Sequence, residues 1–192
     1  MYGAVEDPYC YPRTTVLKNR AGLRPQRALT RFETAMAAQH ADEPLPVGRL
    51  SVRHYCGIHR HLFQDVCTWA GRFRTVRISK GGSMFCYPEH IGVEMHRLFD
   101  QLKHDHYLTG LGRKEFARKG AHFLAEVNAI HPIREGNGRT QLAYFTMLAE
   151  AAGHALELDR LEPDALLQAV IESFGGHEAR LTKLIHNLIA PA

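Results

Sequence analysis

The chain has 192 residues, of which 45 % are hydrophobic and 23 % are charged. This composition is typical of a globular domain with its own core and excludes a disordered chain. Its net charge of +4 comes from Lys and Arg residues scattered along the sequence, so we expect no direct binding to nucleic acid. Without a signal peptide or an apolar stretch of roughly 20 residues, we expect a cytoplasmic protein that does not contact a membrane.

Apolar residues recur at helical spacing along most of the chain, and this pattern predicts an all-α, mainly helical fold. We expect about seven or eight helices and one β-hairpin in a single domain over residues 1–192. After an irregular arm over residues 1–24, the first helix begins at Pro25 and a loop covers residues 42–48. The second helix ends near Gly71, and later helices begin at Pro88, before Phe116, near Arg139, at Pro163 and before Leu181.

One segment, residues 73–88, favours strands over a helix. Residues 73–78 suit a first strand, the pair Gly81-Gly82 predicts a two-residue turn, and residues 84–87 suit the returning strand. Because a lone hairpin is only marginally stable in water, we expect this one to pack on the helices.

The stretch HPIREGNGRTQL occupies residues 131–142 and joins two predicted helices. Gly136 and Gly138 fall just before the second helix, where they let the backbone approach a ligand closely. The first turn of that helix has unpaired N–H groups and the positive end of the helix dipole, which together favour an anion. Arg139 adds a positive charge. The stretch therefore predicts a phosphate site, but not a P-loop, because GxxxxGK[ST] is absent.

An acid and a base accompany this phosphate site. Glu135 would repel a bare phosphate, and Mg²⁺ between the carboxylate and the phosphate removes that repulsion. His131 stands at the end of the preceding helix, where a neutral imidazole can accept a proton from an incoming hydroxyl. The combination predicts transfer of a group from a nucleotide.

The motif resembles the pattern HPFx[D/E]GNGRxxR of the Fic family. Residues 7–23 (DPYCYPRTTVLKNRAGL), 58–91 and 115–153 are also similar to Fic sequences, so the resemblance covers nearly the whole chain. It implies a mostly helical Fic fold. It also implies an enzyme that moves AMP from ATP to a Ser, Thr or Tyr hydroxyl of a target protein and releases pyrophosphate.

The resemblance further implies a role for each position of the motif. His131 matches the general base, Glu135 the Mg²⁺ ligand and Arg139 a phosphate clamp. The hairpin matches the family's flap, which lies over the nucleotide and aligns the target segment by strand pairing. The residues expected to contact ATP are Lys80 and Gly82 in the hairpin and Gly136, Asn137, Gly138, Arg139, Thr140 and Gln141 in the motif.

Two positions depart from the family pattern. Ile133 replaces a Phe that anchors the loop in the core, and another apolar residue should serve there. Leu142 replaces a second Arg that contacts the γ-phosphate, so we expect weaker binding of ATP. Gly138 points toward AMP transfer, because a relative with Lys at this position phosphorylates instead.

The family's inhibitory pattern, [S/T]xxxE[G/N], is absent from the chain. The only [S/T]xxxE, Thr146–Glu150, is followed by Ala151 and lies inside a predicted helix. We therefore expect the toxin subclass whose inhibitor is a separate small antitoxin protein that bears the pattern, and the short single domain fits this expectation. By resemblance, the target is the ATPase subunit of a type II topoisomerase or a GTPase. Two alternatives stay open: a Fic enzyme that transfers UMP, phosphocholine or phosphate, and a binding protein with a weakened site.

The thirteen histidines and four cysteines form no recognisable metal motif. His54, His59 and His61 lie on one predicted helix without HExxH spacing, so we expect no zinc site there. The cysteines form no CxxC motif and are expected to be reduced thiols: Cys10, Cys56, Cys67 and Cys86.

Overall fold

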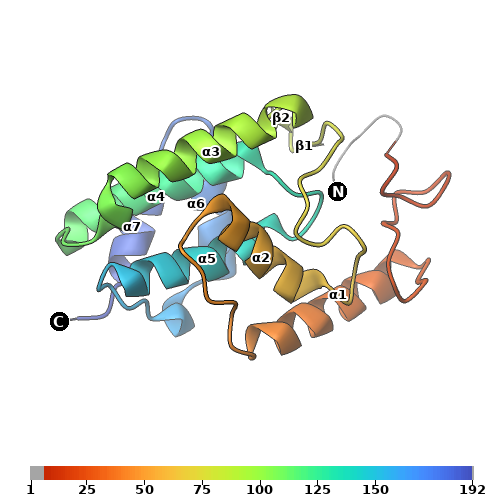
Figure 1. Ribbon diagram of the computed structural model, residues 1–192, viewed down its shortest axis with the longest axis horizontal. Helices are drawn as coiled ribbons and strands as arrows, with labels where there is room; N and C mark the ends of the chain where they lie inside the picture. Colours follow the sequence, from red (N-terminus) through yellow and green to blue (C-terminus); the bar gives the residue numbers. More distant parts are fainter. Residues whose placement is uncertain (1–6, 192) are drawn as a thin grey trace. The chain divides into compact units, whose positions relative to one another are not determined.

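The computed structural model describes residues 7–191, so residues 1–6 of the predicted arm lie outside the described residues. The mainly helical fold is confirmed: the described residues form seven α-helices and one short antiparallel hairpin (Figure 1). No helix within residues 7–191 combines the length and the apolar character that a membrane span needs. In chain order the elements are α1 (Gln26–Ala41), α2 (Val52–Phe63), β1 (Ser79–Lys80), β2 (Ser83–Met84), α3 (Pro88–His104), α4 (Arg113–Ile130), α5 (Asn137–Ala151), α6 (Pro163–Phe174) and α7 (Ala179–Leu188).

The described chain divides into two compact units. The first contains residues 7–92 together with His131–Thr140, and the second contains Val93–Ile130 together with residues 141–191. The motif up to Thr140 thus belongs to the same unit as α1, α2 and the hairpin. The single domain expected over residues 1–192 stays a prediction.

In the first unit, α1 packs against α2. The predicted periodicity is confirmed, since Tyr55, Ile58 and Leu62 lie on the buried face of α2. The Ser51 hydroxyl caps α2 by accepting a hydrogen bond from the backbone N–H of His54 at 3.3 Å. The helix ends at Phe63, earlier than predicted, and the chain then continues in turns to Gly71.

The hairpin is much shorter than predicted, with two residues in each strand. Ser79 pairs with Met84, and Lys80 pairs with Ser83. Between the strands, Gly81 and Gly82 have φ angles of +56° and +85°. Two central residues with positive φ are the requirement of a type I′ turn, so the predicted glycine turn is confirmed.

The predicted strand over residues 73–78 does not form, because its backbone is held by other partners. The N–H of Arg74 donates to the carbonyl of Pro132 at 2.9 Å. The Arg74 guanidinium donates to the carbonyls of Val76 and Cys86, each at 2.6 Å. A side chain and a loop thus satisfy groups that a β-ladder would otherwise pair.

In the second unit, α4 packs against both α6 and α7, which also pack against each other. Phe99, Phe123 and Tyr144 form an aromatic cluster with ring centroids 5.3–5.6 Å apart. A Cβ at Gly120 would lie 2.8 Å from the Phe145 ring, so a larger residue would force α4 and Phe145 apart. Phe116, Gly120, Phe123, Leu124 and Val127 form the buried face that the periodicity of this segment predicts.

Candidate active site

The loop from His131 to Gly136 is shaped by hydrogen bonds within itself. The Asn137 side chain accepts from the N–H of Ile133 at 3.0 Å and donates to the carbonyl of Ile133 at 2.6 Å. The hydroxyl of Thr140 donates to the carbonyl of Gly136 at 3.0 Å. Ile133 itself is fully buried, in keeping with the expected anchoring role of an apolar residue there. The side chains of Asn137 and Thr140 therefore support the loop.

Gly136 is required by the shape of this loop. Its φ angle is +84°, a conformation that favours glycine, and a Cβ would lie 2.5 Å from the Phe63 ring. His131 also has a positive φ, +49°, which is uncommon for a residue with a side chain. The two unusual residues mark the beginning and the end of the turn that precedes α5.

The first turn of α5 has backbone N–H groups at the position predicted for an anion nest, and these groups are called the nest below. The backbone N–H groups of Asn137, Gly138 and Arg139 have no acceptor within residues 7–191. Gly138 is exposed, and a Cβ there would meet no atom within 4 Å. Unpaired N–H groups at the positive end of a helix dipole bind anions, so this turn can hold a phosphate.

His131 is buried, and its ring is held against the hairpin segment. The ring stacks on Phe85, with centroids 3.9 Å apart and an interplanar angle of 18°. The carbonyl of His131 accepts a hydrogen bond from Nε of Arg74 at 2.8 Å. Arg74 is only 2 % exposed, so this bond lies away from water. No local pattern around Arg74 or Phe85 indicated a role, although both contact His131, the predicted base.

Glu135 lies between the nest and a cavity. One carboxylate oxygen accepts from the N–H of Gly136 at 3.0 Å. Burial raises the pKa of Glu135, and the nearby Glu33 carboxylate raises this pKa further, while the Gly136 hydrogen bond and Arg139 lower it. A cation would stabilise this half-buried carboxylate, and its oxygen atoms are the ligands that Mg²⁺ prefers.

The cavity beside Glu135 has a volume of about 380 Å³ and also borders Glu33, Lys80 and Arg134. This size lies within the range of small-molecule sites. A larger hollow of about 1060 Å³ lies against the arm and shares Arg134, but Glu135 does not border it. Glu135 and Lys80, both predicted to act on the nucleotide, line the smaller cavity and not the larger hollow.

The two arginines of the motif have acidic partners. Arg139, the predicted clamp, forms an ion pair with Glu33 of α1 and lies over the Phe63 ring at 4.6 Å. Arg134 is buried and forms an ion pair with Asp7, with its Nη2 2.5 Å from the carboxylate. Glu33 and Asp7 could not be predicted as partners from the sequence, because residues so far apart in the chain leave no local pattern.

The other residues predicted to contact ATP, and Leu142, range from exposed to buried. Lys80 is exposed at the end of β1, and Gly82 is exposed in the turn of the hairpin. Gln141 follows Thr140 in α5 and is buried, and its Nε2 has no hydrogen-bond partner among the described residues. Leu142 is half-buried in the same helix. The first unit thus brings together His131, Glu135, the nest, Arg139 and Lys80.

Comparisons with known proteins agree with the resemblance. Residues 49–149 match the Fic/DOC family. The chain is 50 % identical over 189 residues to the probable protein adenylyltransferase y4lH of Sinorhizobium fredii. This alignment covers 98 % of this chain and 98 % of that protein. It is 34 % identical over 193 residues to the probable protein adenylyltransferase Fic of Salmonella typhimurium, covering 100 % of this chain and 96 % of that protein.

A solved structure extends the similarity to three dimensions. The BepC protein of Bartonella tribocorum, a VirB-translocated effector solved with bound AMPPNP, superposes with a TM-score of 0.87 at 25 % identity. The match covers 96 % of this chain and 97 % of that chain.

Proposed function

As a member of the Fic/DOC family, the chain is a protein adenylyltransferase, and we propose that it transfers AMP from ATP to a Ser, Thr or Tyr hydroxyl of a target protein. The observation that carries the proposal is the single turn between His131 and Arg139, which joins a histidine to an anion nest. The AMPPNP bound to BepC supports ATP as the substrate.

We assign the role of general base to His131. Its imidazole takes the proton of the target hydroxyl while the hydroxyl oxygen forms a bond to the α-phosphorus of ATP. The bond between the α-phosphorus and its bridging oxygen breaks, and pyrophosphate leaves with the electron pair. The stacking on Phe85 and the hydrogen bond from Arg74 support this role, because they limit the movement of His131.

We assign the phosphates of ATP to the nest at the start of α5. The N–H groups of Asn137, Gly138 and Arg139 would donate to phosphate oxygens, and they stabilise the negative charge that develops during transfer. The Arg139 guanidinium pairs with Glu33 through Nη2 only, and its other N–H groups would be directed to phosphate, with Glu33 as a competing anion. Lys80 borders the neighbouring cavity, which supports its proposed contact with the nucleotide.

Glu135 is the proposed ligand for Mg²⁺. Its carboxylate borders the cavity beside the nest, and its burial near Glu33 favours a neutralising cation. The metal ion, when bound, would neutralise the negative charge between this carboxylate and the phosphates. The nucleotide or the loop around it is also proposed to contact Gly82, Thr140 and Gln141.

The β1–β2 hairpin is the proposed docking site for the target segment. The hairpin is two-stranded, and an extended peptide could add a strand along its edge. Met84, at its returning strand, is 52 % exposed and supplies an apolar contact for such a peptide.

We also propose that the chain is the toxin of a toxin–antitoxin pair. The support is that the inhibitory pattern is absent from the sequence, because Thr146 and Glu150 lie within α5 and Ala151 follows them. A small partner protein that bears the pattern would then supply the inhibitor. Co-expression with such a partner should remove any growth defect that the chain causes alone.

The proposed chemistry can be tested with labelled nucleotides. The protein is incubated with a bacterial lysate and with ATP labelled at the α-phosphate or at the γ-phosphate, and in a third sample with α-labelled UTP. Label from α-ATP alone on a protein band supports AMP transfer. Label from γ-ATP would indicate a kinase, and label from UTP would indicate UMP transfer. Absence of label from every donor would contradict the proposed enzyme and favour a binding protein.

A further inference from the structure

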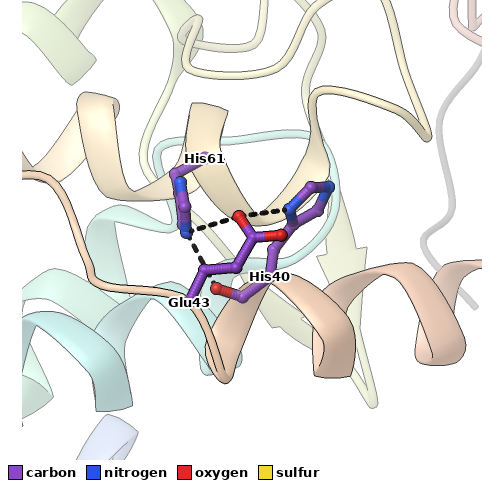
Figure 2. Close-up of side chains that lie close together, drawn as sticks. All are labelled: His40, Glu43 and His61. Carbon is purple, nitrogen blue, oxygen red and sulfur yellow. Dashed lines mark hydrogen bonds and ion pairs between the residues drawn. The ribbon is translucent and has the colours of Figure 1, made fainter.

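Three side chains with metal-ligating atoms meet where α1 and α2 end (Figure 2). His40 is in the last turn of α1, Glu43 follows in the loop, and His61 is in the last turn of α2. Nδ1 of His40 lies 3.2 Å from a carboxylate oxygen of Glu43, and Nε2 of His61 lies 3.9 Å from the same oxygen. The three ligand atoms all lie within 4.8 Å of one another.

These separations are close to those of a zinc site. With bonds of about 2.0–2.2 Å to nitrogen and oxygen, ligand atoms of a tetrahedral zinc ion lie about 3.4 Å apart. The two distances to Glu43 bracket this value, and all three ligand atoms lie within 4.8 Å of one another, so side-chain rotation that draws the two imidazoles together would complete the geometry. Nε2 of His61, which now lies 2.8 Å from the carbonyl of His40, would turn toward the ion.

A fourth side chain orients the first histidine. Nε2 of His40 lies 2.8 Å from a carboxylate oxygen of Asp65, on the opposite side of the ring from Glu43. A histidine that binds a metal through one nitrogen usually donates its other N–H to a carboxylate in this way. When Nε2 donates to Asp65, the lone pair of Nδ1 points toward Glu43. His40 is 5 % exposed, so its ring is held firmly in this orientation.

We propose that His40, Glu43 and His61 bind a divalent transition-metal ion, of which zinc is the best example, with Asp65 as the acceptor that orients His40. Two neutral imidazoles and one carboxylate suit zinc, whereas Mg²⁺ prefers oxygen ligands throughout. The charges of Glu43 and Asp65 balance a 2+ ion. Three protein ligands leave a fourth position for water.

This site is separate from the proposed magnesium ligand. Glu135 lies in the motif, whereas the cluster joins the end of α1 to the end of α2. Because α1 also carries Glu33, the partner of Arg139, a bound ion would hold in place the helix that contacts the clamp.

The test is calorimetric titration of zinc into the full chain, after treatment with a chelator and in excess Mg²⁺. We expect one ion to bind with a dissociation constant of about 10 µM or tighter. Glu43→Gln and His61→Gln should each weaken binding about 100-fold or abolish it, and Asp65→Asn should weaken it about tenfold. His104→Gln is the matched control, because the side chain of His104 is 84 % exposed and lies outside the cluster.

Two further measurements test whether each variant is folded and which side chains bind the metal ion. Circular dichroism confirms that each variant is folded, which we expect for Glu43→Gln because the Glu43 side chain is 45 % exposed. The absorption spectrum with cobalt in place of zinc distinguishes nitrogen and oxygen ligands from the free cysteines, whose thiolates give strong charge-transfer bands. Failure of zinc to bind, binding that the Glu43 and His61 variants leave unchanged, or thiolate bands would each overturn the proposal. Since the readout is metal binding, no outcome depends on transfer of AMP.

Discussion

Glu33 of α1 and Arg139 of α5 form an ion pair across 106 residues of sequence. The Glu33 carboxylate contacts the Arg139 guanidinium, which was predicted to bind the phosphates of ATP. Glu33 also borders the cavity next to Glu135, so the pair lies at the proposed nucleotide site. We therefore expect Glu33 to compete with an incoming phosphate for Arg139.

Replacing Glu33 by Gln should tighten the binding of ATP, because Arg139 loses its competing carboxylate. We expect a modest gain of about threefold to tenfold, since the Arg139 side chain is 39 % exposed and water screens its charge. Calorimetric titration of ATP measures the effect, in a His131→Ala background so that the nucleotide is not consumed. Glu115→Gln, which breaks the exposed ion pair with Arg118, is the control and should leave ATP binding unchanged. Weaker binding in Glu33→Gln would show that Glu33 helps to hold the nucleotide.

Replacing His131 by Ala should remove the general base and slow the transfer of AMP by about 100- to 10,000-fold. Binding of ATP should persist, because the nest is made of backbone N–H groups of α5. Label transfer from α-labelled ATP and calorimetry measure the two effects separately. His122→Ala, at a histidine whose side chain is 60 % exposed in α4, serves as the control. A variant at His131 that transfers AMP at a near-normal rate would refute the assignment.

Replacing Arg74 by Lys should destabilise the protein and slow catalysis together. Arg74 donates to the carbonyls of His131, Val76 and Cys86, and a lysine cannot reach all three with the same geometry. Each buried acceptor left without a donor costs about 1–3 kcal/mol, so we expect the free energy of unfolding to fall by about 2–4 kcal/mol.

Urea denaturation and kcat measure the two effects of Arg74→Lys. The control is Arg77→Lys, since Arg77 lies on the exposed surface with its guanidinium 4.2 Å from the Tyr87 ring. A destabilised Arg74→Lys with normal kcat at saturating ATP would show that Arg74 supports the fold without positioning His131.

His59 should make the protein less stable in mild acid. Its ring is fully buried, with Nε2 2.9 Å from the carbonyl of Glu135 and Nδ1 accepting from the N–H of Gly71 at 2.9 Å. Both bonds are satisfied by the neutral ring, and burial lowers the pKa of His59 to about 4. The unfolded chain therefore binds a proton more readily than the folded one, and stability falls as the pH drops from about 6.5 toward 4.

The loss from His59 should amount to about 3 kcal/mol once the pH is below the folded pKa. Urea denaturation at a series of pH values between 4 and 8 measures it. His59→Gln, whose amide does not titrate, should show a smaller loss over the same range. An equal pH dependence in both proteins would assign the effect to other groups.

Local patterns predicted much of this fold and the backbone of the candidate site. Apolar spacing predicted α4 through residues such as Phe116 and Val127. Gly136 lies in the turn predicted before a helix, whereas α5 begins at Asn137, so Gly138 lies inside its first turn and not before it as expected. These features depend on neighbours within a few positions, which a sequence displays directly.

The partners that hold the site together could not be predicted in this way. One acceptor of the Arg74 guanidinium, the carbonyl of His131, lies 57 residues later in the chain, and Glu33 meets Arg139 across 106 residues. The same holds for His40, which approaches His61 only because α1 lies beside α2, so histidine spacing within one helix could not indicate the cluster. Such pairings depend on tertiary packing and leave no periodic signal.

The division of the first unit along the chain has a consequence for protein synthesis. Residues 7–92 emerge from the ribosome early, but His131–Thr140, which complete the same unit, follow only after Val93–Ile130 have been made. The two hydrogen bonds between Asn137 and Ile133 are local and can form as soon as these residues emerge. Arg74 and Glu33 are synthesised before their partners, His131 and Arg139, so these two contacts form only after the motif has emerged. A nascent chain therefore has no complete candidate active site until Thr140 has been translated, and a fragment that ends at Gly92 lacks the motif altogether.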